Sequence, residues 1–292
     1  MSVPATYGLV ILIWTTTPLA IQWSSATMSP ITALLLRMLI SLSIALALLI
    51  PFGVRGLSWQ KNWKLYLASG FGICPAMPLV YLGSQYIPSG LVSVLFGLSP
   101  FLIGLLSAIF LSDTTMTKGR YISLLIAIIG LGTIFGGGGF SGEQFYLGVG
   151  LLLLAVFVYS ISSVLVKRHS ESVHPIQQLA GSLLVATIAL VIWWAVWDRE
   201  MPNAFTNRSF YALIYLGVVG SVVGFVGYFF LIQRISVNLV SLIPLVTPAL
   251  ALWLGYGLNG EELTAELVGG SALIVCGLAL FNLFRPRRSE TV

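Results

Sequence analysis

The chain has 292 residues, of which 58% are hydrophobic and 8% are charged, and its mean hydropathy is +0.99. A soluble domain has roughly 25% charged residues, so this chain has too few charges to cover a water-facing surface, and its exterior must face lipid. The apolar runs are long and lack the alternation of β-barrel strands, which indicates an all-α polytopic membrane protein. The net charge of +5 is then better explained by basic loops that orient the helices than by nucleic-acid binding.

Ten apolar runs are long enough to cross a bilayer, which takes about 20 helical residues. In chain order they cover residues 4–23, 30–50, 63–84, 89–111, 118–135, 145–166, 175–197, 209–233, 237–258 and 263–284. We interpret the first run as a retained helix, because no basic segment precedes it and no convincing cleavage site follows. The connections are short, so consecutive helices are expected to be antiparallel neighbours.

The basic residues predict the orientation of these helices. If the N-terminus is cytoplasmic, eleven Lys and Arg residues fall in cytoplasmic segments, two fall in the opposite loops, and Arg37 remains within the second helix. This bias predicts that both termini are cytoplasmic. The eleven are Arg55, Lys61, Lys64, Lys118, Arg120, Lys167, Arg168, Arg234, Arg285, Arg287 and Arg288, and the two are Arg199 and Arg208.

One stretch of the fourth run is repeated in the ninth. Residues 92–113, VSVLFGLSPFLIGLLSAIFLSD, align without gaps with residues 240–261, VSLIPLVTPALALWLGYGLNGE, so that Asp113 corresponds to Glu261. The two copies are five helices apart, and an odd offset makes them insert in opposite directions. The sequence therefore predicts ten transmembrane helices arranged as a 5+5 inverted repeat, a common architecture of secondary transporters. The two units meet at a glycine-rich loop around residues 136–142.

Four segments resemble the EamA branch of the drug/metabolite transporter superfamily: WTTTPLAIQW, LLLRMLI, QYIPSGLVSVLFGLSPFLIGLLSAIFLSD and YFFLIQRISVNLVSLIPLVTPALALWLGYGLNGEELT. The resemblance covers nearly the whole chain as two five-helix EamA units, residues 4–136 and 145–284. The first unit departs from the family pattern, because it has Ser112-Asp113 in place of Gly-Glu and Trp14-Thr15 in place of Trp-Gly.

The resemblance implies a secondary transporter of the bacterial inner membrane that moves a small organic solute by alternating access. It favours export of an amino acid or a related metabolite. Three alternatives stay open, namely another solute class such as a drug-like compound or sugar derivative, uptake in place of export, and a lipid-handling membrane protein.

Arg37 is the only charged residue well inside a predicted span, about two turns or roughly 10 Å below the outer end of helix 2 at 1.5 Å per residue. An intramembrane ionisable residue is a functional candidate. The alternative is that Arg37 snorkels to the headgroups. No Asp or Glu lies in the middle of a span, which argues against proton-coupled export of organic cations. Together with broken helices, Arg37 suits an anionic or zwitterionic substrate better.

Two prolines fall near the middle of helices 4 and 9, and each follows a hydroxyl residue: Ser99-Pro100 and Thr247-Pro248. A proline removes a backbone donor and frees a carbonyl one turn earlier. In lipid this is tolerated only where protein or a water-filled cavity satisfies the carbonyl. Equivalent midplane positions of an inverted repeat meet where substrate sites lie, so we expect these four residues to line the substrate site. A packed kink is the alternative.

Aromatic and hydroxyl residues at middle depth complete the predicted substrate-binding set, which adds Trp14, Tyr81, Tyr159, Ser160 and Tyr228 to Arg37 and the two proline pairs. Buried tyrosine hydroxyls require hydrogen-bond partners, so Tyr81 and Tyr159 are the preferred members, with Ser160 beside Tyr159. For any single aromatic residue, ordinary packing or lipid contact is the alternative.

The sequence carries no motif for catalysis or for a cofactor. The glycine run at 136–139 is not followed by the Lys-Ser/Thr of a phosphate loop, and Cys74 and Cys276 have no partner nearby in the sequence. No Ser/His/Asp or paired-carboxylate arrangement can assemble at one depth. We therefore expect no enzyme activity, no cofactor and no metal. The expected partners are a small-molecule substrate and the lipid bilayer, without nucleic acid, for a monomer or homodimer.

Overall fold

The computed structural model describes residues 2–110, 116–136, 142–169, 173–201, 204–232, 234–235 and 243–284. Within these ranges, nine helical segments of 19 to 27 residues are long and apolar enough to cross a membrane, and a tenth apolar helix has 17 residues. The described ranges contain helices, turns and loops and no strand. The protein is thus an all-α polytopic membrane protein, as predicted.

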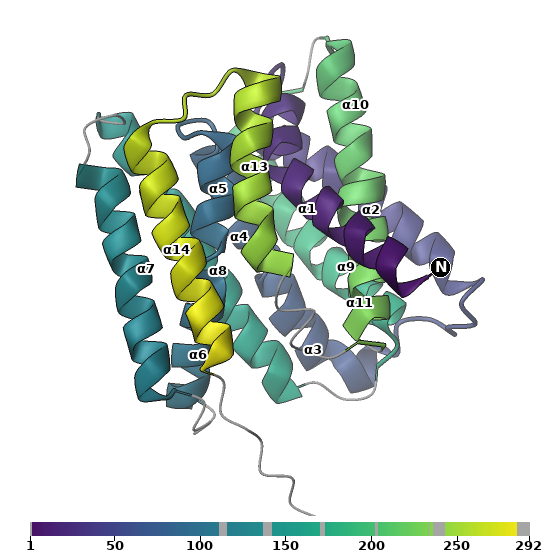
Figure 1. The fold of residues 1–292 in the computed structure, drawn as a ribbon. Helices are drawn as coiled ribbons and strands as arrows, with labels where there is room; N and C mark the ends of the chain where they lie inside the picture. The colour runs from purple at the N-terminus through teal and green to yellow at the C-terminus, as the bar shows by residue number, and fades with distance from the viewer. Residues whose placement is uncertain are drawn as a thin grey trace, which may run out of the picture.

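In the first half of the chain the helices are α1 Val3–Ser24, α2 Pro30–Leu49, α3 Trp59–Phe71, α4 Ala76–Gly83, α5 Ser89–Phe96, α6 Ser99–Phe110 and α7 Lys118–Gly136 (Figure 1). In the second half they are α8 Glu143–His169, α9 Pro175–Trp193, η1 Trp194–Asp198, α10 Asn207–Tyr215, η2 Leu216–Val223, α11 Gly224–Ile232, α13 Ile243–Asn259 and α14 Ala265–Leu283, where η marks a π-helix. The third and fourth spans are each divided into two helices.

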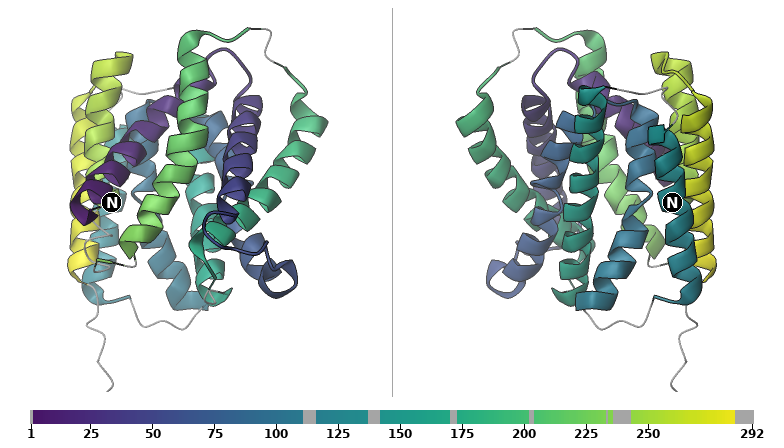
Figure 2. Two further views of the ribbon diagram at one scale, coloured as in Figure 1. Left: turned by 90° about the vertical axis from the view of Figure 1, so that its right-hand side faces the viewer. Right: turned by 90° about the vertical axis from the view of Figure 1, so that its left-hand side faces the viewer.

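The helices form one bundle whose two halves share a core. α7 and α14 pack side by side along one edge, while α13 packs against α1 and α5, and α2 packs against α9 (Figures 1 and 2). The largest apolar cluster joins Leu34 of α2, Leu91 of α5, Leu152 of α8 and Leu216 of η2, each of which is at most 1% exposed. Residues from both halves therefore meet in the interior.

The two ends of the bundle are named here after one residue at each. We call the end with the loops at residues 25–29, 84–88 and 260–264 the Glu261 end, which is uppermost in Figure 1. At the opposite Arg120 end, α7 begins and α14 finishes. There Arg120 is buried, its Nε donates to the Phe281 carbonyl at 3.2 Å, and its guanidinium lies 4.3 Å from the centre of the Phe281 ring. A cation suits this position because a helix C-terminus carries partial negative charge.

The corresponding helices of the two units run in opposite directions. α5 begins at the Glu261 end, where Glu261 accepts a hydrogen bond from the Ser89 N–H, whereas α13 finishes at that end with Asn259. Because the sequence repeat aligns α5 and α6 with the segment that contains α13, this opposite direction shows the predicted inverted repeat. Asp113 and most of the glycine-rich loop between the units lie outside the described residues.

The fourth span differs from the continuous helix that the sequence suggests. α5 stops at Phe96 and α6 begins at Ser99, so Pro100 is the second residue of a new helix and not a kink in the middle of one. Proline is well tolerated there, because the N–H groups of a first turn have no helical partner. The Phe96 carbonyl accepts a hydrogen bond from Ser99 Oγ at 2.7 Å. Pro248, in contrast, lies inside the continuous helix α13.

The eighth span contains the π-helix η2, which the sequence did not predict. A π-helix bonds each residue to the one five positions earlier. Ser221 follows this pattern with its side chain, because its Oγ donates to the Leu216 carbonyl at 2.9 Å. The Gly217 carbonyl accepts from Ser41 Oγ of α2, also at 2.9 Å. The bond from Ser41 holds η2 against α2, and the bond to Leu216 helps to set the direction in which Ser221 faces.

Candidate substrate site

Arg37 occupies the interior of the bundle. Its side chain on α2 is 5% exposed. Its Nε donates to Ser221 Oγ of η2 at 3.1 Å, and its Nη1 donates to the Tyr81 hydroxyl of α4 at 3.4 Å. Three elements, drawn from both halves of the chain, therefore meet at one guanidinium. This geometry excludes the alternative in which Arg37 snorkels to the headgroups.

The Arg37 charge has no carboxylate partner among the residues that the structure describes. Within those ranges the acidic residues all lie at helix ends or in loops, namely Glu143, Asp198, Glu200, Glu261, Glu262 and Glu266. The two partners of Arg37 are neutral hydroxyls. A buried charge is costly unless an opposite charge or enough hydrogen bonds compensate it. The site is therefore suited to an anionic group that enters from outside the chain.

Aromatic rings from four helices lie around a second part of the interior. The rings of Trp14 on α1 and Tyr228 on α11 have centroids 5.0 Å apart. Tyr159 on α8 packs against Phe96 on α5 with centroids 6.0 Å apart. Tyr159 is 38% exposed although it lies well inside α8. Such rings can provide apolar walls for an organic solute.

The two repeated Ser/Thr-Pro pairs come together only in part. Pro248 lies against the break between α5 and α6, because a Cβ built on Gly97 would be 3.7 Å from the Pro248 ring. Ser99 and Thr247 are both buried, while Pro100 is half-buried at the start of α6. The Ser99 hydroxyl donates its hydrogen bond to the Phe96 carbonyl. It therefore stabilises the helix break and has no free proton to donate to a ligand.

Ser160 does not join the site beside Tyr159 as predicted. It is fully buried, and its Oγ donates to the Val156 carbonyl of its own helix at 2.7 Å. Successive residues of an α-helix are rotated by about 100° around the axis, so Tyr159 and Ser160 face different neighbours.

Two residues that the sequence did not predict, Ser221 and Thr15, lie beside predicted members of the site. Ser221 binds Arg37 directly. The hydroxyl of Thr15, next to Trp14 on α1, is buried and has no hydrogen-bond partner within the described ranges. Ser221 was difficult to find because the π-helix adds a residue to the turn and so changes the face on which later side chains lie.

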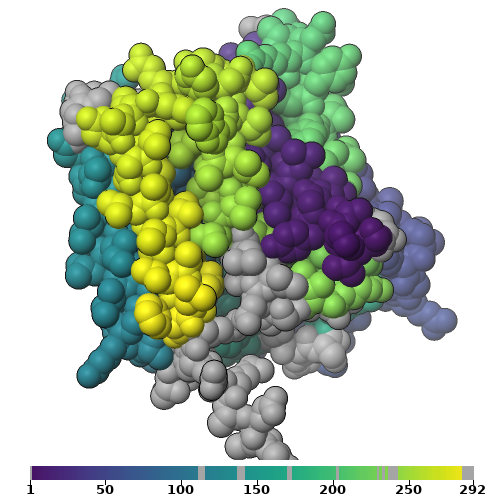
Figure 3. Space-filling model, viewed as in Figure 1, coloured from purple at the N-terminus to yellow at the C-terminus, as the bar shows by residue number. Residues whose placement is uncertain are grey.

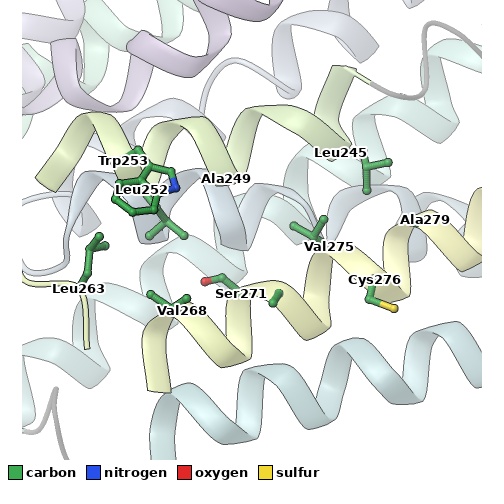
Figure 4. A pocket seen from close by; sticks show the side chains of 11 residues that line it. Leu245, Ala249, Leu252, Trp253, Leu263, Val268, Ser271, Val275, Cys276 and Ala279 are labelled. Atoms are coloured by element: carbon green, nitrogen blue, oxygen red, sulfur yellow. The ribbon is translucent and has the colours of Figure 1, made fainter. Parts of the chain in front are cut away.

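A cavity of about 630 Å³ lies away from this interior, on the flank of the bundle between α13 and α14 (Figure 4). Figure 3 shows the surface hollowed between these two helices. Ser271 and Cys276 are its only members that are not hydrocarbon or aromatic, and the others are Leu245, Ala249, Leu252, Trp253, Leu263, Val268, Ala272, Val275 and Ala279. Trp253 is 66% exposed, so the cavity opens toward the lipid side. Its described lining residues include no charged group that could bind an anion.

The described ranges contain no group of three or more His, Cys, Asp or Glu side chains that could hold a metal ion.

The fold and the interior site together define a multi-pass membrane transporter, with two inverted units around a polar centre. The model of the EamA-like transporter family matches the chain twice, at residues 7–136 and 146–283. The chain belongs to this family.

Similar proteins are known from bacteria and archaea. An "Uncharacterized transporter" of Archaeoglobus fulgidus is 25% identical and aligns over 93% of this chain and 95% of its own. For the "Uncharacterized transporter YoaV" of Bacillus subtilis the identity is 26%, with 96% of both chains covered. The "Uncharacterized inner membrane transporter YedA" of Escherichia coli is 27% identical over 68% of this chain and 63% of its own. A solved crystal structure with 21% identity has a TM-score of 0.70 over 99% of both chains, and so shares the fold.

Proposed function

We propose that the protein is a secondary transporter of the inner membrane that binds the carboxylate of a small organic solute, such as an amino acid or a related metabolite, at Arg37. One observation carries this proposal: a buried guanidinium bound to two neutral hydroxyls, with no carboxylate partner among the described residues. A substrate carboxylate can accept two parallel hydrogen bonds from arginine and can compensate its charge. The rings of Trp14, Tyr228 and Tyr159 would then face the rest of the solute.

The transport direction in this proposal is export, with the Glu261 end on the periplasmic side and both termini in the cytoplasm. The basic residues support that orientation. Those at the Arg120 end are Arg55, Lys61, Lys64, Lys118, Arg120, Lys167, Arg168 and Arg234, whereas the described basic residues at the Glu261 end are Arg199 and Arg208. Cytoplasmic loops of membrane proteins carry such an excess of Lys and Arg.

The sequence contains no nucleotide-binding motif, so a solute or ion gradient drives the transport.

The cavity between α13 and α14 gives little support to a lipid-handling function. A lipid that crosses the membrane needs a polar path for its headgroup, because polar groups are costly in hydrocarbon. Ser271 is the one hydroxyl residue among the described residues that line the cavity. The cavity can therefore hold an apolar chain, but it supplies no headgroup path.

Metabolite efflux tests the proposal in intact cells. Cells that overexpress the protein should release one or more carboxylate-bearing metabolites, and Arg37→Gln should reduce this release by at least about tenfold, because a charge-assisted hydrogen bond is lost in a buried site. Arg37→Lys should retain part of the activity if charge alone matters, and none if the planar guanidinium is needed. Arg199→Gln, which removes an exposed loop arginine, is the matched control. Release by Arg37→Gln at the wild-type level, with equal protein in the membrane, would show that Arg37 is structural.

A further inference from the structure

Glu261 joins the two halves of the transporter at one end of the bundle. It lies in the loop between α13 and α14, and its Oε1 and Oε2 accept hydrogen bonds from the N–H groups of Ser89 at 3.0 Å and Gly90 at 3.3 Å. Ser89 and Gly90 are the first two residues of α5. The N–H groups of a first turn have no helical partner and lie at the positive end of the helix dipole, so they bind a carboxylate favourably.

Asn259, at the end of α13, extends this contact to α1. Its Nδ2 lies 3.0 Å from Glu261 Oε1 and 3.2 Å from Gln22 Oε1, to both of which it donates. Its Oδ1 accepts from Trp23 Nε1 at 3.0 Å. The guanidinium of Arg208, at the start of α10, lies 3.9 Å from the centre of the Trp23 ring. Helices α1, α5, α10 and α13 are thus held together at the Glu261 end.

The same network continues toward the substrate site. Gln22 Nε2 donates to the carbonyls of Ser84 at 3.0 Å and Ile87 at 2.9 Å, in the loop that follows α4. Ser84 Oγ donates to the Tyr81 carbonyl at 2.9 Å, and the Tyr81 hydroxyl binds Arg37. The short helix that carries Tyr81 is therefore linked to Arg37 on one side and, through Ser84, to Gln22 of α1 on the other.

Close packing of α5 against α13 leaves little room beneath Glu261. A Cβ built on Gly90 would lie 2.6 Å from a Leu252 methyl group, and one built on Gly255 would overlap the Glu261 carboxylate. Ser93 lies one turn below Ser89 on the same face of α5 and is 8% exposed. We call this close contact between α5 and α13 the closure at the Glu261 end.

We propose that Glu261 is the latch of this closure: its carboxylate holds α5 of the first half to the second half, and it must release α5 before a solute can pass at the Glu261 end. The consequence for transport rests on the proposed function, since alternating access requires each end to open in turn. The latch suits this task because it consists of a few charge-assisted hydrogen bonds that one side chain accepts. They can break while the helices themselves stay intact.

Cysteine labelling tests the latch without any substrate. Ser93→Cys is introduced into a protein whose two free cysteines, Cys74 and Cys276, are replaced by serine, and this protein is the reference. A membrane-impermeant maleimide is applied to intact cells and to inverted vesicles, so that the result does not depend on orientation. Glu261→Gln should raise the labelling rate from the Glu261 end by about tenfold, because an amide group presents N–H donors to the α5 N–H groups and carries no charge.

Two further variants decide between a latch and a general loss of packing. Glu261→Asp keeps the charge on a shorter side chain and should label at an intermediate rate. Glu262→Gln removes the exposed acid next to it and should label like the reference. Reference-rate labelling in Glu261→Gln would overturn the proposal. If Glu261→Gln does not accumulate, Asn259→Ala replaces it, and an unchanged rate in that variant has the same meaning. Transport by Arg37→Gln tests the proposed function, whereas the labelling rate tests the latch. Loss of transport in Arg37→Gln with an unchanged labelling rate would show that the two proposals can be tested separately.

Discussion

Arg37 is able to bind an anion because its hydrogen-bond partners are uncharged. The hydroxyls of Ser221 and Tyr81 orient the guanidinium but leave its charge in place. A carboxylate at either position would have compensated that charge permanently and removed the electrostatic reason to bind an anion. The lack of mid-span acids, visible in the sequence, and the burial of Arg37, visible only in the fold, therefore support the same class of substrate.

The two repeated prolines should behave differently when each is replaced by alanine. Pro248 lies inside α13, so Pro248→Ala should restore a helix hydrogen bond to the Pro244 carbonyl and raise the free energy of unfolding by about 1 kcal/mol. Pro100 is in the first turn of α6, so Pro100→Ala should change the stability little. Thermal unfolding in detergent measures both. Equal stabilisation by the two substitutions would contradict the helix break before Pro100.

At the scale of the elements, η2 is the feature that brings α2 and the eighth span together. Gly217 lies where the two helices approach closely, and a Cβ at this position would be 2.7 Å from Cγ2 of Ile40 on α2. The approach allows Ser41 to bind the Gly217 carbonyl and Arg37 to reach Ser221. A glycine in this span is therefore part of the geometry of the candidate site.

Gly217→Ala should destabilise the protein by about 1–3 kcal/mol, the usual cost of overpacking a helix interface. Thermal unfolding measures this loss. Gly257→Ala is the matched control, because a Cβ there meets nothing within 4 Å, and it should be neutral or slightly stabilising. In an Ile40→Ala background the cost of Gly217→Ala should shrink, since the clashing methyl group is gone. A cost that persists in that background would place the close contact elsewhere.

At the scale of the whole molecule, the orientation of the bundle can be tested at two described loops. Gly56 lies between α2 and α3 at the Arg120 end, and Phe205 lies between η1 and α10 at the Glu261 end. With the cysteine-free protein as background, Phe205→Cys should react with an impermeant thiol reagent in intact cells, whereas Gly56→Cys should react only in inverted vesicles. The opposite result would reverse the proposed orientation, and labelling of both cysteines from one side would contradict the odd number of spans between them.

The sequence by itself determined the class of the protein, its ten apolar spans and the inverted relation of its halves. These properties depend on the lengths of the apolar runs and on the number of runs between the two repeats, both of which are counted along the sequence. The length of an apolar run must match the bilayer, and an odd number of helices between two repeats reverses their direction. The family resemblance followed from the same segments, and the matches at residues 7–136 and 146–283 confirm it.

Only the tertiary structure decided which side chains meet. Arg37 reaches Ser221 because a π-helix changes the face of the eighth span, Ser160 turns back to its own helix, and Glu261 binds the start of α5 from the other half of the chain. Each of these contacts depends on the rotation of a helix about its axis and on its neighbours in space. One extra residue in a turn rotates all later side chains about the helix axis. The composition of an apolar span does not indicate whether that rotation occurs.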